Sequence, residues 1–162
     1  MGEPKVVTRS GSGYVLHLGK DERALVARLV DELRAVLTEP EARDAATRLF
    51  PVVHPDRPDQ EAEYQRLMRD ELVTSRLAGI EVVEAVLGRS GRKVTLDEGE
   101  MMALVQAVNS VRLVLGTVLD VGEDDDVDPQ AAVVDTPEYH LYGYLSWILE
   151  SAVQAMSGNL PR

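Results

Sequence analysis

Two polar side chains stand in the most apolar predicted helix of the chain. Asn109 and Arg112 are three residues apart, so both lie on one side of that helix. A buried guanidinium needs acceptors or a counter-charge, because an unpaired buried charge is very costly. We expect Glu150 of the last predicted helix to complete a buried polar network with them, with Asp70 and Glu71 as alternative partners. The other interpretation, that Asn109 and Arg112 line a ligand site, stays open.

A second candidate for chemistry is a pair of carboxylates. Glu81 and Glu84 form the E-x-x-E spacing that places two carboxylates on one helix face, as metal ligands do in some all-α nucleotide pyrophosphatases. A partner pair on the next helix is missing, because Glu98 and Glu100 fall in its first turn, where the helix dipole already favours acidic residues. A metal-dependent nucleotide hydrolase is therefore an alternative, not the first expectation.

No metal or cofactor site is expected elsewhere. Asp124, Asp126 and Asp128 alternate like the start of a calcium-binding EF-hand loop, but Pro129 stands where that loop needs glycine and Asp135 where it needs glutamate. The three histidines lie on separate predicted elements, and the chain has no cysteine. This composition excludes disulfides, thiolate metal sites and a cysteine nucleophile. We expect no cofactor.

Acidic and aromatic residues form a candidate partner surface. The loop after the central helix is acidic, and the last helix carries tyrosines away from its predicted core face; the candidate residues are Glu123, Asp124, Asp125, Asp126, Tyr139 and Tyr144. Tyrosine is enriched at protein interfaces, because its ring is large and its hydroxyl bonds to a partner. We therefore expect a protein partner here.

The charge balance bears on the kind of partner. The formal net charge is −11, and it arises in residues 58–162, because residues 1–57 carry nine basic and nine acidic side chains. Such a surface repels a phosphate backbone, so direct nucleic-acid binding is not expected. No signal peptide and no apolar run long enough for a membrane span are present, so we expect a cytoplasmic protein.

The N-terminal region predicts a β-hairpin over residues 5–18. Runs rich in β-branched and aromatic residues flank a turn at Ser10–Gly13, where glycine permits positive φ. The free edge of this hairpin could pair with a second copy and form a homodimer. Covering by loops of the same chain is the interpretation we favour.

Helical periodicity accounts for most of the remaining chain. We expect a bundle over about residues 20–158, built from five helices at Asp21–Leu37, Thr38–Leu49, Glu61–Leu87, Thr95–Val121 and Thr136–Gly158. The fourth is apolar on most sides and should be the central helix. We expect it to begin with a capping box of Thr95 and Glu98. Gly79 within the third should permit close approach of a neighbouring helix.

The sequence therefore predicts one mainly α domain over residues 1–162, a compact bundle of about five helices around a central helix, with a short N-terminal β-hairpin. A chain of this length can bury a sizeable core.

The order of motifs resembles an actinobacterial family of domains of unknown function, encoded beside the ClpS adaptor of the Clp protease. The resemblance covers nearly the whole chain and is carried by Asp21–Leu25, Leu49–Pro51 with His54–Asp56, Val94–Glu98, Ala107–Gly116, and Tyr139–Glu150 with Tyr142, Leu145 and Trp147. The run from Ala107, with Asn109, Arg112 and Gly116, is moderately specific together with the aromatic last helix.

The resemblance implies a mostly helical cytoplasmic protein whose relatives are sometimes labelled transcriptional or oxidative-stress regulators. A cysteine-based switch is not available to this chain. We therefore expect a non-enzymatic regulatory protein that acts through protein–protein contact with the transcription machinery. The rival from the family's gene neighbourhood is an accessory factor of Clp proteolysis.

Overall fold

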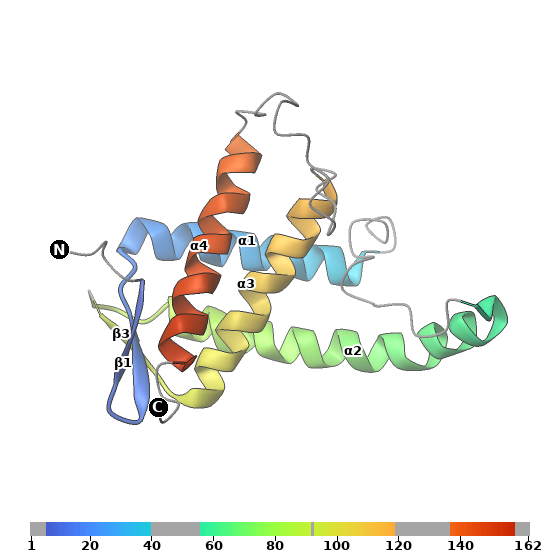
Figure 1. The fold of residues 1–162 in the computed structure, drawn as a ribbon, viewed down its shortest axis with the longest axis horizontal. Helices are drawn as coiled ribbons and strands as arrows, with labels where there is room; N and C mark the ends of the chain where they lie inside the picture. Colours follow the sequence, from blue (N-terminus) through green and yellow to red (C-terminus); the bar gives the residue numbers. More distant parts are fainter. Residues whose placement is uncertain (1–5, 40–55, 92, 119–136, 158–162) are drawn as a thin grey trace.

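The computed structural model describes residues 6–39, 56–91, 93–118 and 137–157. Four helices and three strands follow one another in these ranges (Figure 1). In chain order they are β1 (Val7–Ser10), β2 (Gly13–Leu16), α1 (Lys20–Thr38), α2 (Pro58–Leu87), β3 (Val94–Leu96), α3 (Glu98–Val118) and α4 (Pro137–Ser157). The mainly α architecture with an N-terminal hairpin is confirmed. The short helix predicted at Thr38–Leu49 falls largely outside the described residues.

The hairpin is part of a larger sheet than the sequence indicated. Gly11 occupies the left-handed region at φ 59° in the two-residue turn between β1 and β2. β3 pairs antiparallel with β2, which gives a three-stranded sheet in the order β1-β2-β3. The prediction that Thr95 caps the central helix was wrong, because Thr95 is exposed at the middle of β3, opposite Val15.

Both outer strands of the sheet have backbone groups bonded to side chains of the same chain. On β1, the Val7 N–H donates to Ser151 Oγ of α4 at 3.3 Å. On β3, Arg89 Nη1 donates to the Thr95 carbonyl at 2.7 Å. These side chains cover groups that another strand would need for pairing. On β1 the covering element is a helix, not the loop that we expected.

The central position of α3 follows from its contacts. It packs against α1, α2 and α4 and also against β2 and β3, and Figure 1 shows α3 and α4 side by side, crossing α1 and α2. Met101, Leu104 and Val108 are buried along it. The capping box is shifted by two residues from the prediction: the Asp97 N–H donates to Glu100 Oε1 and the Glu100 N–H to Asp97 Oδ1.

Burial along α2 is uneven. Its 30 residues make a helix about 45 Å long. Its buried side chains are confined to the C-terminal part, Ile80, Val83, Val86 and Leu87. The other half extends beyond the bundle in Figure 1. The deeper C-terminal half agrees with the second apolar stripe that appears after Leu72 in the sequence.

Gly79 does not have the environment that we predicted. A Cβ built on it meets no atom of the described residues within 4 Å, so none of the described helices approaches closely there. It lines a small cavity together with Arg76 and Ser110, which are joined by a hydrogen bond of 2.9 Å from Nη1 to Oγ. Burial lowers the pKa of Arg76, and the Ser110 hydroxyl gives that guanidinium an acceptor.

The core is aliphatic and is shared by all the elements. It joins the inward side chains of the sheet to those of the four described helices, with Tyr14 the largest of the fully buried side chains. None of the described helices is long and apolar enough to cross a membrane.

Candidate functional site

The structure places two of the three predicted network residues together. Arg112 Nη2 donates to Asn109 Oδ1 at 3.0 Å, and the Arg112 guanidinium lies 5.9 Å from the centre of the Tyr142 ring on α4. Asn109 and Arg112 are half-buried, whereas Glu150 is exposed on α4. Because an aromatic face attracts a cation, the Tyr142 ring takes the place on α4 that we assigned to a carboxylate.

The carboxylate pair of α2 is divided between two environments. Glu84 Oε1 lies 2.7 Å from Arg34 Nη1 of α1, and this carboxylate is the main cause that raises the pKa of Arg34. Glu81 is exposed. No cluster of three or more acidic or histidine side chains able to hold a metal occurs in the described ranges. The geometry around Glu84 is that of an ion pair linking α1 to α2.

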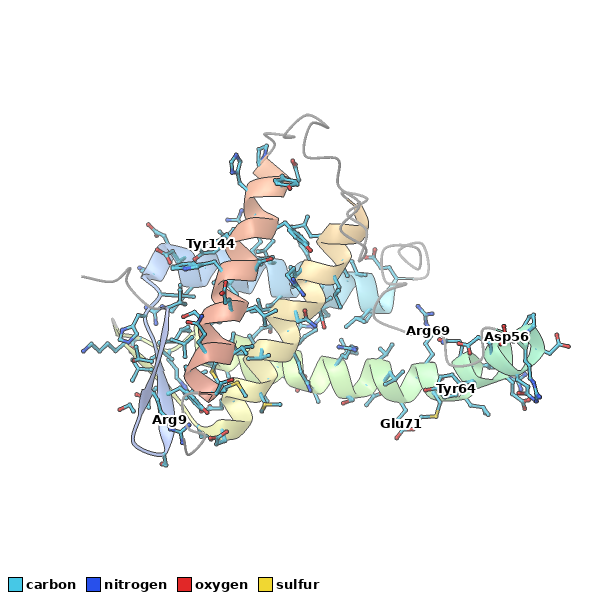
Figure 2. All side chains as sticks on the ribbon, in the orientation of Figure 1. Arg9, Asp56, Tyr64, Arg69, Glu71 and Tyr144 are labelled. Atoms are coloured by element: carbon cyan, nitrogen blue, oxygen red, sulfur yellow. The ribbon has the colours of Figure 1, made fainter. Side chains whose placement is uncertain are left out.

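The candidate partner surface is only partly described. Glu123, Asp124, Asp125 and Asp126 lie outside the described residues. Tyr139 is 41% exposed in the first turn of α4. Tyr144 is half-buried, and its hydroxyl donates to Glu22 Oε2 at 3.0 Å, so it ties α4 to the first turn of α1 (Figure 2). Burial, followed by this carboxylate, raises the pKa of Tyr144.

The outer face of α4 carries apolar side chains that the protein leaves exposed. Trp147 is 38% exposed and Val153 is 48% exposed, on the same side of the helix as Tyr139. With Gly143 and Glu150, which are also exposed, these residues recur every three or four positions. We call this set, Tyr139, Gly143, Trp147, Glu150 and Val153, the outer face of α4. It lies opposite the buried Leu145, Ile148 and Ala152.

The described part of the structure does not require a glycine at the middle of this face. A Cβ added to Gly143 meets no atom within 4 Å. Glycine inside a helix costs about 0.5–1 kcal/mol relative to alanine. Nothing in the described part of the chain offsets this cost at Gly143. The backbone of a partner that approached closely would occupy the space that a side chain would otherwise fill.

The indole of Trp147 is supported from one side. Its ring centre lies 6.0 Å from that of Tyr144, with a tilt of 39° between the planes. Tyr144 is itself held by Glu22, so the Trp147 ring is presented on a fixed neighbour. A pre-positioned aromatic side chain loses less conformational entropy on binding than a free one.

The sequence already places Trp147 away from the core face of α4, but neither Trp147 nor Val153 was among the candidate contact residues. The signal was present in the spacing, because Tyr139, Gly143 and Trp147 recur every four residues on one helix face. The packing of α4 on α3 and β1 confirms the core face that the spacing of Leu145, Ile148 and Ala152 predicts, and it leaves Trp147 and Val153 exposed.

Comparison with known proteins identifies one family model. The model described as "Domain of unknown function (DUF2017)" matches residues 3–156. No curated protein and no solved structure matches the chain.

Proposed function

We propose that this protein, which belongs to the DUF2017 family of domains of unknown function, is a non-enzymatic regulatory protein that acts through protein–protein contact. The outer face of α4 is the contact surface. The observation that carries this proposal is that Trp147 is exposed one helical turn from Gly143. Nothing in the described part of the chain requires residue 143 to be a glycine.

Interfaces concentrate their binding energy in a few residues, and tryptophan and tyrosine are the most enriched of them. On α4, Trp147 would be the central anchor, with Tyr139 and Val153 beside it. Gly143 would admit a partner backbone, as small residues do where two helices cross closely. A helix of the partner laid across Gly143 therefore fits this face.

The chemistry of the partner follows from the charges around the face. Residues 137–157 contain Glu138 and Glu150 but no lysine or arginine. A partner that places lysine or arginine at the rim of the contact would be steered towards it, and the association rate would fall with added salt. We propose a component of the transcription machinery as this partner. The Clp system is the alternative partner, and the experiment below distinguishes it from the transcription machinery.

The test begins with crosslinking and ends with affinities. A photoreactive amino acid at position 147 is incorporated in the full chain, and the crosslinked protein is identified in the native host. The dissociation constant of that protein is then measured for the original chain, Trp147→Ala and Gly143→Ala. We expect each change to weaken binding at least about tenfold, as removal of about 1.4 kcal/mol or more would.

Gly143→Ala separates binding from folding. The change removes a helix-destabilising residue and meets no neighbour, so the free protein should be as stable as the original or up to about 1 kcal/mol more stable. Leu67→Ala is the matched control, because Leu67 is 65% exposed on α2, away from α4. Unchanged affinity in both α4 variants, or an equal loss in Leu67→Ala, would refute the surface. Crosslinking to a Clp component would instead identify the Clp system as the partner, in place of the proposed transcription machinery.

A further inference from the structure

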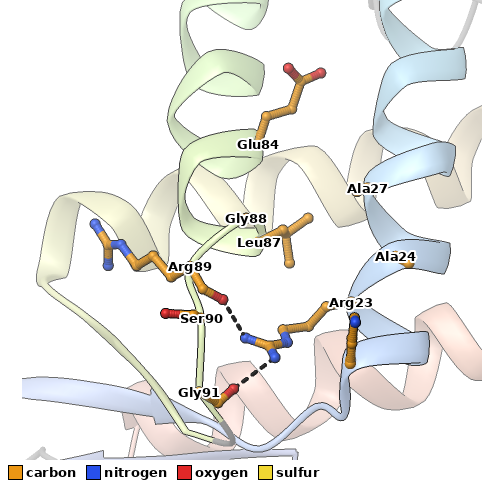
Figure 3. Close-up of a pocket in the computed structure, with 10 residues that line it drawn as sticks. Arg23, Ala24, Ala27, Glu84, Leu87, Gly88, Arg89, Ser90 and Gly91 are labelled. Carbon is orange, nitrogen blue, oxygen red and sulfur yellow. Dashed lines mark hydrogen bonds between the residues drawn. The ribbon is translucent and has the colours of Figure 1, made fainter.

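A cavity opens between α1 and the C-terminal end of α2. Its volume is about 470 Å³, within the usual range for small-molecule sites. α1 contributes Lys20, Arg23, Ala24 and Ala27; the end of α2 and the loop after it contribute Glu84 and Leu87–Gly91 (Figure 3). The two alanines and Leu87 form an apolar wall, and the polar or charged side chains of the lining are Lys20, Arg23, Glu84, Arg89 and Ser90.

Arg23 is the least exposed charged residue of this cavity. The residue is only 7% exposed. Nη1 donates to the Arg89 carbonyl at 2.8 Å and Nη2 to the Gly91 carbonyl at 2.7 Å, as the dashed lines of Figure 3 show. Its Nε is buried without a hydrogen-bond partner. Two carbonyl dipoles orient this guanidinium, but they supply no counter-charge, and an uncompensated buried cation is costly.

The other charges of the cavity do not balance Arg23. The Glu84 carboxylate lies against Arg34, at 2.7 Å. The Arg89 guanidinium is bonded to Glu100 of α3, and in Figure 3 its side chain points away from Arg23. Lys20 is exposed, and no ion pair joins it to any residue in the described ranges. Lys20 and Arg23 therefore leave two positive charges at one cavity, in a protein with a net charge of −11.

We propose that this cavity binds a small organic phosphate. The phosphate group lies between Lys20 and the Arg23 guanidinium, where two cations meet a group that carries close to two negative charges. The organic part lies along Ala24, Ala27 and Leu87. The volume is sufficient for a molecule of mononucleotide size. This inference is independent of the proposed function, because it rests on α1 and α2 and not on α4.

The probe is adenosine monophosphate, with inorganic phosphate as the comparison. Each is titrated into the ¹⁵N-labelled full chain at constant ionic strength, and amide shifts are followed by NMR. We expect saturable shifts for Lys20, Arg23 and the loop Gly88–Gly91. The nucleotide should bind at least about threefold more tightly than inorganic phosphate, because only it reaches the apolar wall. Equal affinities would overturn the organic part of the proposal, and shifts no larger than with sodium chloride would overturn all of it.

Two variants test the charges. Lys20→Ala should weaken nucleotide binding at least about fivefold, because it removes one of the two cations. Since Lys20 is exposed, this variant should keep the fold, as checked by circular dichroism. Arg28→Ala is the matched control: Arg28 is also exposed on α1, and it is not among the residues of the cavity. Equal weakening by both variants would show nonspecific charge attraction and refute the site.

Discussion

Gly13 and Gly79 lie in opposite steric environments. A Cβ on Gly13 would stand 2.5 Å from the Leu96 carbonyl oxygen, because β3 packs against the start of β2. That contact is too short for any side chain, and a backbone atom would have to shift. A Cβ on Gly79 would meet nothing within 4 Å. The sheet therefore depends on one glycine, whereas α2 gains nothing visible from the other.

Gly79→Ala should stabilise the protein and Gly13→Ala should destabilise it. The first change improves helix propensity in open space and should raise the free energy of unfolding by about 0.5–1 kcal/mol. The second overpacks the β2–β3 contact and should lower that free energy by about 1–3 kcal/mol. Urea unfolding measures both. A destabilised Gly79→Ala variant would mean that the glycine is needed for close packing, as the sequence had indicated.

At the scale of elements, Glu100 connects three parts of the chain. Its carboxylate accepts the Asp97 N–H at the start of α3 and is bonded to the Arg89 guanidinium after α2, and Arg89 also donates to Thr95 of β3. The hydrogen bond from Arg89, followed by that from the Asp97 backbone, lowers the pKa of Glu100 below its ordinary value of 4.5. One side chain thus caps a helix and fixes the residue that covers a strand edge.

The stability contributed by Glu100 should depend on pH. A carboxylate with a lowered folded-state pKa stabilises the protein above its ordinary pKa, and this stabilisation is lost as the pH falls from about 4.5 through the folded-state value. Glu100→Gln should therefore be less stable than the original chain at pH 7, with a smaller difference at pH 3. Glu71→Gln, exposed on α2, is the control. Urea unfolding at both pH values measures the effect, and a pH-independent difference would contradict it.

At the scale of the whole molecule, α2 is the least evenly supported helix. Its C-terminal part lies in the core, with Ile80, Val83 and Val86 buried. No residue from Pro58 to Gly79 is buried, and Leu67 is 65% exposed. Most helical stability comes from packing of the apolar face and not from propensity. The two halves of α2 should therefore differ in local stability.

Amide hydrogen exchange should divide α2 into two parts. Amides of residues 62–72 should exchange at least about tenfold faster than those of residues 80–87, because they open locally without disturbing the core. The stretch of α3 from Met101 to Val111, which contains the buried Leu104 and Val108, is the internal reference for strong protection. Equal protection along α2 would contradict this expectation and would indicate that the first half is held as firmly as the second.

Much of the architecture was readable in the sequence, because it depends on local periodicity. The apolar stripe of α1 predicted Asp21–Leu37, and the structure has Lys20–Thr38; the hairpin and the central helix were predicted in the same way. The strand β3 was missed, because three residues are too few to show a two-residue period, and its Thr95 sits in a T-x-x-E spacing. The box that actually forms, Asp97 with Glu100, lies two residues later.

The candidate sites depended on tertiary structure, because side chains far apart in sequence define them. The sequence alone determined that α4 is amphipathic and carries aromatic residues, and that Asn109 and Arg112 share a helix face. Only the packing of α4 on α3 and β1 decided how far Trp147 is exposed and that Tyr142 reaches Arg112. Likewise, the fold brings the Arg23 side chain of α1 to the carbonyls of Arg89 and Gly91, which lie 66 and 68 residues later in the chain. Helical spacing fixes which side chains share a face, but contacts between elements decide what each face meets.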